Sequence, residues 1–353
     1  MSFQTLARRV RDPKLPLGLR YAALRSALEH YRRIGYDAAW AFITRDDARP
    51  GSAAGPRRLD ESGLLKALGR IETSRAAWLA EAAAFAERRT ALKRLRLPAD
   101  RDEVRYRFGR RWPGPDAYEA TAFAVAYQWQ RRTTRREEPP TRPLIEPLEA
   151  ELAPLVDAYL GGGLDAAGRR RLPELMERLE AAVLALYTEH GVRAPVLPLR
   201  RTAELIRHDA LPLVRRGWTG DAERVTEVFW AARSEMAYLP ALHTYDETAW
   251  WVREVMIPSS ELWIAERRGT PVGFAALDGN VLAHLYVEPA SQGLGVGEAL
   301  IAKAKRRRKG LDLQVFEQNH GARAFYARHG FSFVMETLGN EERLPALHLL
   351  WRR

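Results

Sequence analysis

Several features are missing from this chain of 353 residues, and each absence argues against a kind of site or a class of protein. It contains no cysteine, which excludes disulfide bonds, thiolate nucleophiles and cysteine-bound metals. Its eight histidines show no spacing typical of metal ligands, so we expect no metal site. No apolar run approaches the roughly 20 residues that a membrane-spanning helix needs. The first residues also lack the apolar stretch of a secretory signal, so we expect a cytoplasmic, bacterial-type protein without a membrane partner.

Positive charge, in contrast, is abundant and unevenly placed. The net charge is +11, yet residues 201–353 hold 20 Lys and Arg against 19 Asp and Glu, so the excess lies in residues 1–200. Such an excess suits an acidic partner or a nucleic acid such as tRNA or DNA. However, 50 of the 56 basic residues are arginine and acidic residues are interspersed among them, as is common in proteins from GC-rich genomes. A specific nucleic-acid role is therefore the weaker interpretation.

Residues 1–198 have the pattern of a helical domain. Apolar residues recur every three or four positions through long segments rich in Ala, Leu, Glu and Arg. Asp165 is expected to cap one of these helices, because a side-chain oxygen there can accept a free N–H of the first turn. The segment Gly191–Pro198 is the expected linker. We therefore predict two domains, 1–198 and 199–353, the first serving recruitment of a substrate or partner, or homodimerisation.

Aromatic residues are frequent in the helical half, and they allow two interpretations. A row of exposed rings could stack on nucleic-acid bases. Aromatic residues at helical spacing more often form a core, which we favour here. The mixed basic and aromatic run Arg105–Trp112 could contact an anion or form a solvated edge. The residues concerned are Trp40, Trp78, Trp112, Tyr118, Tyr127 and Trp129.

A glycine-rich turn in the second half is the most informative motif. The apolar strand Val281–Val287 ends at a proline, and Gln292–Gly297 then opens directly into a helix. Glycines at such a turn let the backbone approach a ligand closely. The unpaired N–H groups and the dipole of the helix's first turn favour an anion. The glycine spacing does not fit the dinucleotide fingerprint, and no Lys-Ser/Thr pair follows as in a P-loop. The segment therefore predicts a pyrophosphate-binding site.

This turn resembles the acetyl-CoA loop of the GNAT family (the Gcn5-related N-acetyltransferases), Gln/Arg-x-x-Gly-x-Gly/Ala, with Gln292, Gly295 and Gly297 at its defining positions. The segment Asn319–Phe331 also resembles the family's Asn-x-x-Ala-x-x-Phe-Tyr-x-x-x-Gly-Phe motif. The resemblance covers residues 211–353. It implies an α/β domain with a mixed, mainly antiparallel sheet and flanking helices, following the helical domain. It also implies an acetyl-CoA-dependent N-acetyltransferase (EC class 2.3.1) acting on an amine of a small molecule, peptide or protein.

The resemblance assigns residues to acetyl-CoA. Main-chain groups at the end of the strand would polarise the thioester carbonyl, with Val287 the strongest candidate. Asn319 and Ala322 begin the later helix, where Asn319 would bind the pantetheine arm or cap the helix. The full set is Leu285, Tyr286, Val287, Gln292, Gly293, Leu294, Gly295, Val296, Gly297, Glu298, Asn319, Ala322 and Tyr326.

The resemblance also assigns catalysis. Tyr326 matches the family tyrosine that protonates the departing CoA sulfur; the competing interpretation is a half-buried aromatic residue of an amphipathic helix. The base is left open between His284, which has a suitable unperturbed pKa, and Glu317 after the next strand. Alternation predicts that His284, Tyr286 and Glu288 share one face of their strand.

The acceptor amine is expected beside two segments that border this site in the family. One is the aromatic-rich stretch between the first two helices of the domain, and the other precedes the last strand, where carboxylates would attract a cationic amine or take its proton. The candidates are Tyr238, His243, Tyr245, Glu341 and Glu342. An alternative function is a nucleic-acid-associated protein whose basic half binds tRNA or DNA, and a third is an interaction protein that merely binds CoA.

Overall fold

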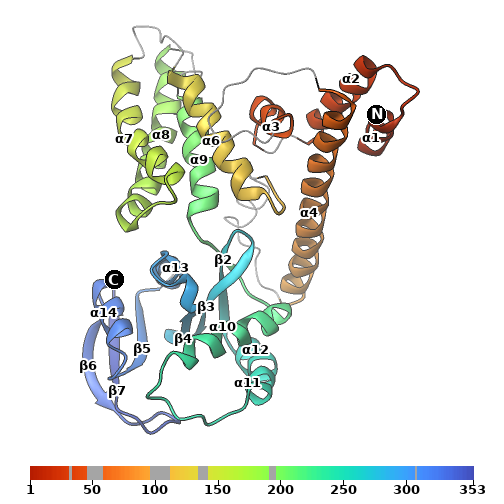
Figure 1. Cartoon of the computed structure of the whole chain (residues 1–353). Helices are drawn as coiled ribbons and strands as arrows, with labels where there is room; N and C mark the ends of the chain where they lie inside the picture. The colour runs from red at the N-terminus through yellow and green to blue at the C-terminus, as the bar shows by residue number, and fades with distance from the viewer. Residues whose placement is uncertain (32–33, 46–58, 96–111, 134–141, 191–195, 307) are drawn as a thin grey trace. The chain divides into compact units, whose positions relative to one another are not determined.

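The computed structural model describes residues 1–353 except 32–33, 46–58, 96–111, 134–141, 191–195 and 307. The chain forms two compact units, one of residues 1–86 and 105–211 and the other of residues 87–104 and 212–353 (Figure 1). Among the described residues, every helix is too short or too polar to traverse a lipid bilayer. The segment Arg105–Trp112 lies outside the described residues except for Trp112.

The first unit is built of helices, as the sequence pattern predicts. Asp165 precedes α8, and its Oδ1 accepts the backbone N–H of Gly168 at 2.7 Å, which confirms the predicted cap. The helices are α1 (Phe3–Arg11), α2 (Leu17–Glu29), α3 (Tyr36–Ile43), α4 (Glu61–Arg94, whose last turns belong to the second unit), α6 (Ala117–Thr133), α7 (Arg142–Leu160), α8 (Ala166–His190) and α9 (Leu197–Ala210).

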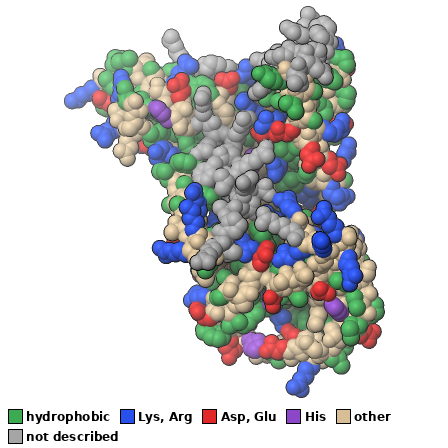
Figure 2. All heavy atoms as spheres, turned by 180° about the vertical axis from the view of Figure 1, so that it is seen from behind, with side chains coloured by type: hydrophobic (Ala, Val, Ile, Leu, Met, Phe, Trp, Pro, Cys, Tyr) green, Lys and Arg blue, Asp and Glu red, His purple; other side chains and the backbone are tan. Residues whose placement is uncertain are grey.

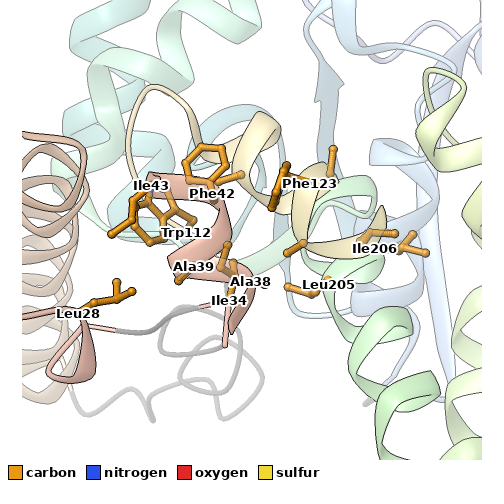
Figure 3. Packing of buried hydrophobic residues seen from close by; sticks show 14 of the residues in the cluster. Leu28, Ile34, Ala38, Ala39, Phe42, Ile43, Trp112, Phe123, Leu205 and Ile206 are labelled. Atoms are coloured by element: carbon orange, nitrogen blue, oxygen red, sulfur yellow. The ribbon is translucent and has the colours of Figure 1, made fainter. Parts of the chain in front are cut away.

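Aromatic and aliphatic side chains fill the core of this unit (Figure 3). Trp112 is fully buried, and its ring contacts those of Tyr31 and Phe42 edge-on at 5.8 and 5.6 Å. The other aromatic residues considered for base stacking pack, partly buried, against the same core: Trp40, Trp78, Tyr118, Tyr127 and Trp129. The core interpretation is therefore confirmed. On the face that Figure 2 shows, the described Lys and Arg side chains are scattered among acidic and apolar ones.

The first unit ends at Leu211, after the expected linker Gly191–Pro198, of which residues 191–195 lie outside the described residues. Helix α9 begins at Leu197 and buries Leu199, Ala203 and Ile206 in the helical core. Because its hydrophobic face packs into this core, α9 belongs to the first unit, which ends at Leu211. The proline at the first turn of α9 starts a helix instead of a linker, as its fixed φ allows.

The second unit is a seven-stranded sheet in the order β1-β2-β3-β4-β5-β7-β6. All neighbouring strands are antiparallel except β4 and β5, so the sheet is mixed and mainly antiparallel, as expected. The strands are β1 (Leu213–Arg216), β2 (Glu261–Arg267), β3 (Thr270–Asp278), β4 (Val281–Val287), β5 (Gly310–Phe316), β6 (Ser332–Thr337) and β7 (Ala346–Arg352).

Helices cover both faces of this sheet, with a separate apolar cluster on each face. One cluster joins the sheet to α13 (Val296–Lys305) and α14 (His320–Arg328). The other joins it to α10 (Ala222–Ser234) and to α11 (Tyr245–Trp251), which continues through the π-helical turn η2 (Val252–Met256) into α12 (Ile257–Ser259). Two short 3-10 turns, η1 (Thr219–Asp221) and η3 (Pro289–Ser291), precede α10 and α13.

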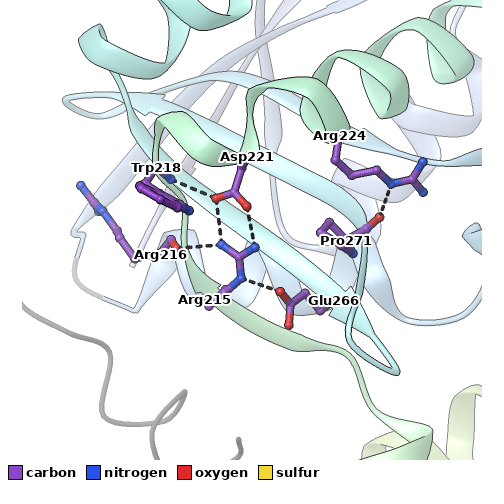
Figure 4. Close-up of polar contacts among 7 residues, drawn as sticks. All are labelled: Arg215, Arg216, Trp218, Asp221, Arg224, Glu266 and Pro271. Atoms are coloured by element: carbon purple, nitrogen blue, oxygen red, sulfur yellow. Dashed lines mark hydrogen bonds and ion pairs between the residues drawn. The ribbon is translucent and has the colours of Figure 1, made fainter. Parts of the chain in front are cut away.

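A buried arginine anchors the start of α10 to the sheet (Figure 4). Arg215 on β1 donates to both carboxylate oxygens of Asp221 at 2.6 and 2.9 Å, and to Glu266 on β2 at 2.6 Å. Asp221 also accepts the backbone N–H of Trp218 at 3.0 Å. The two carboxylates raise the pKa of Arg215 despite its burial, so the guanidinium keeps its charge. This network fixes α10, which carries residues of the candidate site.

Candidate functional site

The site is centred where β4 and β5 separate. β4 pairs with β3 along its whole length, from Val281 opposite Asp278 to Val287 opposite Gly273. With β5 it shares a single register position, Val281 opposite Asp312. Beyond that pair, the β5-facing edge of β4 has no strand partner among the described residues. Backbone polar groups left unpaired in this way are available to a ligand.

A β-bulge in β4 determines which of its side chains point toward α10 and which point toward α13. Leu282 lies opposite Leu277, but His284 lies opposite Ala276, so Ala283 is an extra residue in β4. After the bulge, His284 and Tyr286 contact Phe229 on α10, with ring centroids 6.3 and 4.8 Å away. Leu285 and Val287 pack toward the α13 cluster instead.

The glycine-rich turn adopts the backbone conformation that its sequence predicts. Gly293 and Gly295 have φ values of 71° and 83°, which are unfavourable for most other residues. α13 begins at Val296, and the N–H groups of Val296, Gly297 and Glu298 belong to its first turn. These groups have no carbonyl four residues earlier in the helix, so they form an anion-binding helix start. Gln292 is exposed, and its Nε2 lies 3.4 Å from the Val287 carbonyl oxygen.

Gly297 has a packing role as well. A Cβ at this position would lie 3.2 Å from the Phe325 ring of α14. The absence of a side chain therefore lets α13 approach α14 closely. At Gly293, by contrast, a Cβ would meet nothing within 4 Å, so this position faces open space.

The cations at the end of α13 are held within the protein. Lys305 donates to the His329 carbonyl and lies over the Trp351 ring at 4.5 Å. Arg308 donates to the Gly279 carbonyl at 3.0 Å and to Glu261 at 2.9 Å. Lys305 and Arg308 therefore have partners within the protein and do not need a ligand phosphate to balance their charge.

Tyr326 lies on α14, buried among residues of the core beneath β5 and β7. Its ring contacts that of Phe331 at 5.5 Å. Burial, with a smaller contribution from Tyr286, raises the pKa of Tyr326 above its usual range. The hydroxyl therefore carries its proton at neutral pH, as a general acid must. Its helix is capped by Asn319, whose Oδ1 accepts the Ala322 N–H at 3.0 Å.

The two candidate bases have very different surroundings. His284 lies beside Trp251 and Phe229, with ring centroids 5.3 and 6.3 Å away. Burial and the nearby charge of Arg233 lower the pKa of His284 to about 4. Such an imidazole is neutral at pH 7 and can accept a proton, although less readily than an ordinary histidine, so His284 stays a candidate base. Glu317 follows β5 with an exposed side chain and remains a candidate.

Two segments far apart in the sequence meet on the expected acceptor side. Arg233 of α10 donates to Glu342 at 2.7 Å, and His243 Nε2 lies 2.8 Å from Glu341 Oε1. The ring of Tyr238 contacts that of Phe316 at the end of β5 at 5.9 Å. The structure thus places predicted acceptor residues next to the gap between β4 and β5.

Both carboxylates expected to attract the acceptor have a partner within this unit: Glu341 contacts His243, and Glu342 pairs with Arg233. Glu342 has a side chain only 9% exposed, so its charge is largely compensated by Arg233. Tyr245, in turn, packs edge-on against Trp230 at 5.5 Å.

Arg233 itself was missed by sequence reasoning. Besides Glu342, it lies over the Phe229 ring at 5.3 Å and is close enough to Tyr286 to oppose the rise that burial causes in that residue's pKa. In the sequence it is one arginine among many on amphipathic helices. Its role becomes visible only through contacts with residues far along the chain.

Comparison with known proteins agrees with this geometry. Residues 258–333 match a family model described as "Acetyltransferase (GNAT) domain". The peptidyl-lysine N-acetyltransferase YiaC of Escherichia coli is 28% identical over 116 residues, which is 31% of this chain and 80% of that protein. The peptidyl-lysine N-acetyltransferase YjaB of Salmonella typhimurium is 37% identical over 100 residues, 27% of this chain and 68% of that protein. The solution structure of apo YjaB from Escherichia coli is 28% identical, covers 40% of this chain and 97% of that one, and has a TM-score of 0.36.

Proposed function

Because the chain belongs to the GNAT family and is an N-acetyltransferase, we propose that it transfers the acetyl group of acetyl-CoA directly to the ε-amine of a lysine in a protein or peptide. The observation that carries this proposal is the separation of β4 from β5 beside the glycine-rich turn, with Tyr326 on the adjoining helix. The lysine acceptor is supported by the two relatives, both named peptidyl-lysine N-acetyltransferases.

The residues present suit the pyrophosphate of acetyl-CoA. The first-turn N–H groups of α13 supply donors, and the helix dipole adds positive potential. Open space at Gly293 and the positive φ of Gly293 and Gly295 permit a close approach of the backbone. The unpaired edge of β4 at residues 285–287 would hold the pantetheine arm and the thioester, with Val287 the nearest of these to the turn.

When bound, acetyl-CoA supplies the thioester carbon that the amine attacks. Main-chain N–H groups of β4 would stabilise the negative charge that develops on the carbonyl oxygen. As the carbon–sulfur bond breaks, Tyr326 would donate its proton to the sulfur, and the new amide nitrogen would lose a proton to His284, Glu317 or water. Because the chain has no cysteine, an acetyl-cysteine intermediate is ruled out, which supports direct transfer in a ternary complex.

The proposal can be tested with the full-length protein, acetyl-CoA and a lysine-containing peptide. Mass spectrometry should find one acetyl group on the lysine of the peptide, and initial rates with both substrates varied should give intersecting reciprocal plots. Incubation without peptide should leave the intact mass of the protein unchanged. Absence of any acetylated amine, or an acetylated protein that passes its acetyl group to the peptide, would contradict the proposal.

A further inference from the structure

The helix α11 presents an aromatic residue to solvent between two carboxylates. Trp250 is 62% exposed, although the next residue, Trp251, packs inward against His284. Asp246 lies one turn before Trp250 and Glu254 lies one turn after it, both exposed. A large exposed aromatic ring flanked by carboxylates favours binding of a cation, because both the ring face and the carboxylates attract positive charge.

A second pair of exposed rings lies on α10 and at the start of α11. Trp230 on α10 and Tyr245 at the start of α11 are 38% and 39% exposed, and their rings meet at 5.5 Å. Two residues before Tyr245, His243 is paired with Glu341 of the β6–β7 segment. The exposed aromatic residues thus occupy the same helices and loop that border the gap between β4 and β5.

The charge of this region is opposite to that of the chain. Residues 222–260 contain six acidic and three basic residues, in a protein of net charge +11. Within the described structure, the carboxylates of Glu223, Glu235, Asp246 and Glu254 have no ion-pair partner. Of the three arginines, Arg224 and Arg233 are paired, which leaves Arg253. The uncompensated charge on α10 and α11 is therefore negative.

We propose that this acidic aromatic face, made of Asp246, Trp250 and Glu254, binds a basic segment of the acceptor protein that flanks the lysine to be acetylated. The inference rests on the proposed function for the identity of the acceptor. The occupant is an Arg- or Lys-rich peptide, because its cations complement both the carboxylates and the ring faces. A nucleic acid is disfavoured on this face, since its phosphates would be repelled.

The test uses binding, so that it does not depend on turnover. Two fluorescein-labelled peptides, each with one lysine, carry either arginines or glutamates on both sides of it, and fluorescence anisotropy measures their affinity for the full-length protein. The arginine peptide should bind more tightly, and added salt should weaken it. Trp250→Ala, or Asp246→Asn combined with Glu254→Gln, should each weaken it about tenfold, as expected for a cation–π contact or two surface ion pairs lost together.

The matched control is Glu336→Gln, which removes one exposed carboxylate from β6 of the same unit. It should leave the affinity for the arginine peptide unchanged. Equal affinity for the two peptides, or a loss as large in the control as in the Asp246/Glu254 variant, would overturn the inference. If the arginine peptide binds as expected yet no acetylated lysine appears, the docking face stands and the proposed lysine acceptor fails.

Discussion

The guanidinium of Arg233 on α10 lies 2.7 Å from the carboxylate of Glu342, although 109 residues separate the two in the chain. This ion pair ties the first helix after β1 to the segment that precedes the last strand. It does so beside Tyr286, at the end of β4 that β5 leaves unpaired. The acceptor side of the site therefore depends on a contact between elements from the two ends of the unit.

Replacing Arg233 should act on the acceptor and leave acetyl-CoA unaffected. In Arg233→Gln, the largely buried Glu342 loses its charged partner, and the loss of such a hydrogen bond costs about 1.5–3 kcal/mol. We expect the KM for the acceptor peptide to rise while the KM for acetyl-CoA stays constant. The charge-reversed pair Arg233→Glu with Glu342→Arg should recover part of the loss. A rise confined to the KM for acetyl-CoA would contradict this assignment.

The hydroxyl of Tyr326 should matter for the chemical step alone. In Tyr326→Phe the ring still fills its place against Phe331, but the proton donor is lost. Turnover should fall by about 10²–10⁴-fold, as is typical for general acid–base catalysis. The dissociation constant of acetyl-CoA, measured by isothermal titration calorimetry, should be retained. Tyr187→Phe, at an exposed tyrosine of α8, is the control. Wild-type turnover in Tyr326→Phe would make Tyr326 a purely structural residue.

Two substitutions at Gly293 separate the effect of a negative charge on acetyl-CoA binding from the effect of a side chain at this position. Asn and Asp both tolerate positive φ better than most residues, and a Cβ at this position meets open space. Gly293→Asp and Gly293→Asn should therefore have similar stability. A carboxylate near the pyrophosphate costs about 1–4 kcal/mol, depending on how much water screens it. Titration with acetyl-CoA should show weaker binding for Gly293→Asp than for Gly293→Asn, and equal affinities would argue against a pyrophosphate here.

The stability of the second unit should fall in acid because of His284. Burial lowers the pKa of His284 to about 4, whereas an unfolded histidine has a pKa of about 6.5. Between these values the unfolded chain binds a proton that the folded chain does not, so stability present above pH 6.5 is lost as the pH falls toward 4. The loss is of the order of 3 kcal/mol at most. Urea unfolding at pH 7 and pH 5 should show a smaller difference for His284→Phe than for the wild type.

Arg215 should be far more important for stability than an exposed arginine. Arg215→Leu leaves Asp221 and Glu266 buried without their shared cation, and breaking such a pair costs about 3–5 kcal/mol. Arg178→Leu removes an exposed ion pair with Glu151 on the helical unit and should change the stability far less, because water screens such a pair. Thermal unfolding followed by circular dichroism compares the two variants. Similar losses in both would show that the buried network contributes little.

Local sequence determines much of this protein. The apolar run Val281–Val287 predicts strand β4 with the observed bounds. Glycines predict the turn before α13, since Gly293 and Gly295 adopt positive φ there. Asn319 predicts the start of α14, because its side chain caps that helix. Each of these features depends on residues close together in the chain.

Tertiary structure decides the rest, because it depends on contacts between distant residues. The first unit extends to Leu211 because the buried face of α9 packs into the helical core, which the prolines before it do not reveal. Histidine has a suitable pKa by itself, but Phe229, Trp251 and Arg233 lower that of His284. Glu341 and Glu342 resemble free carboxylates in the sequence, yet His243 and Arg233 pair with them in the fold. The residue type determines the chemistry available to a side chain. Burial and neighbours distant in the sequence determine its pKa and its interaction partners.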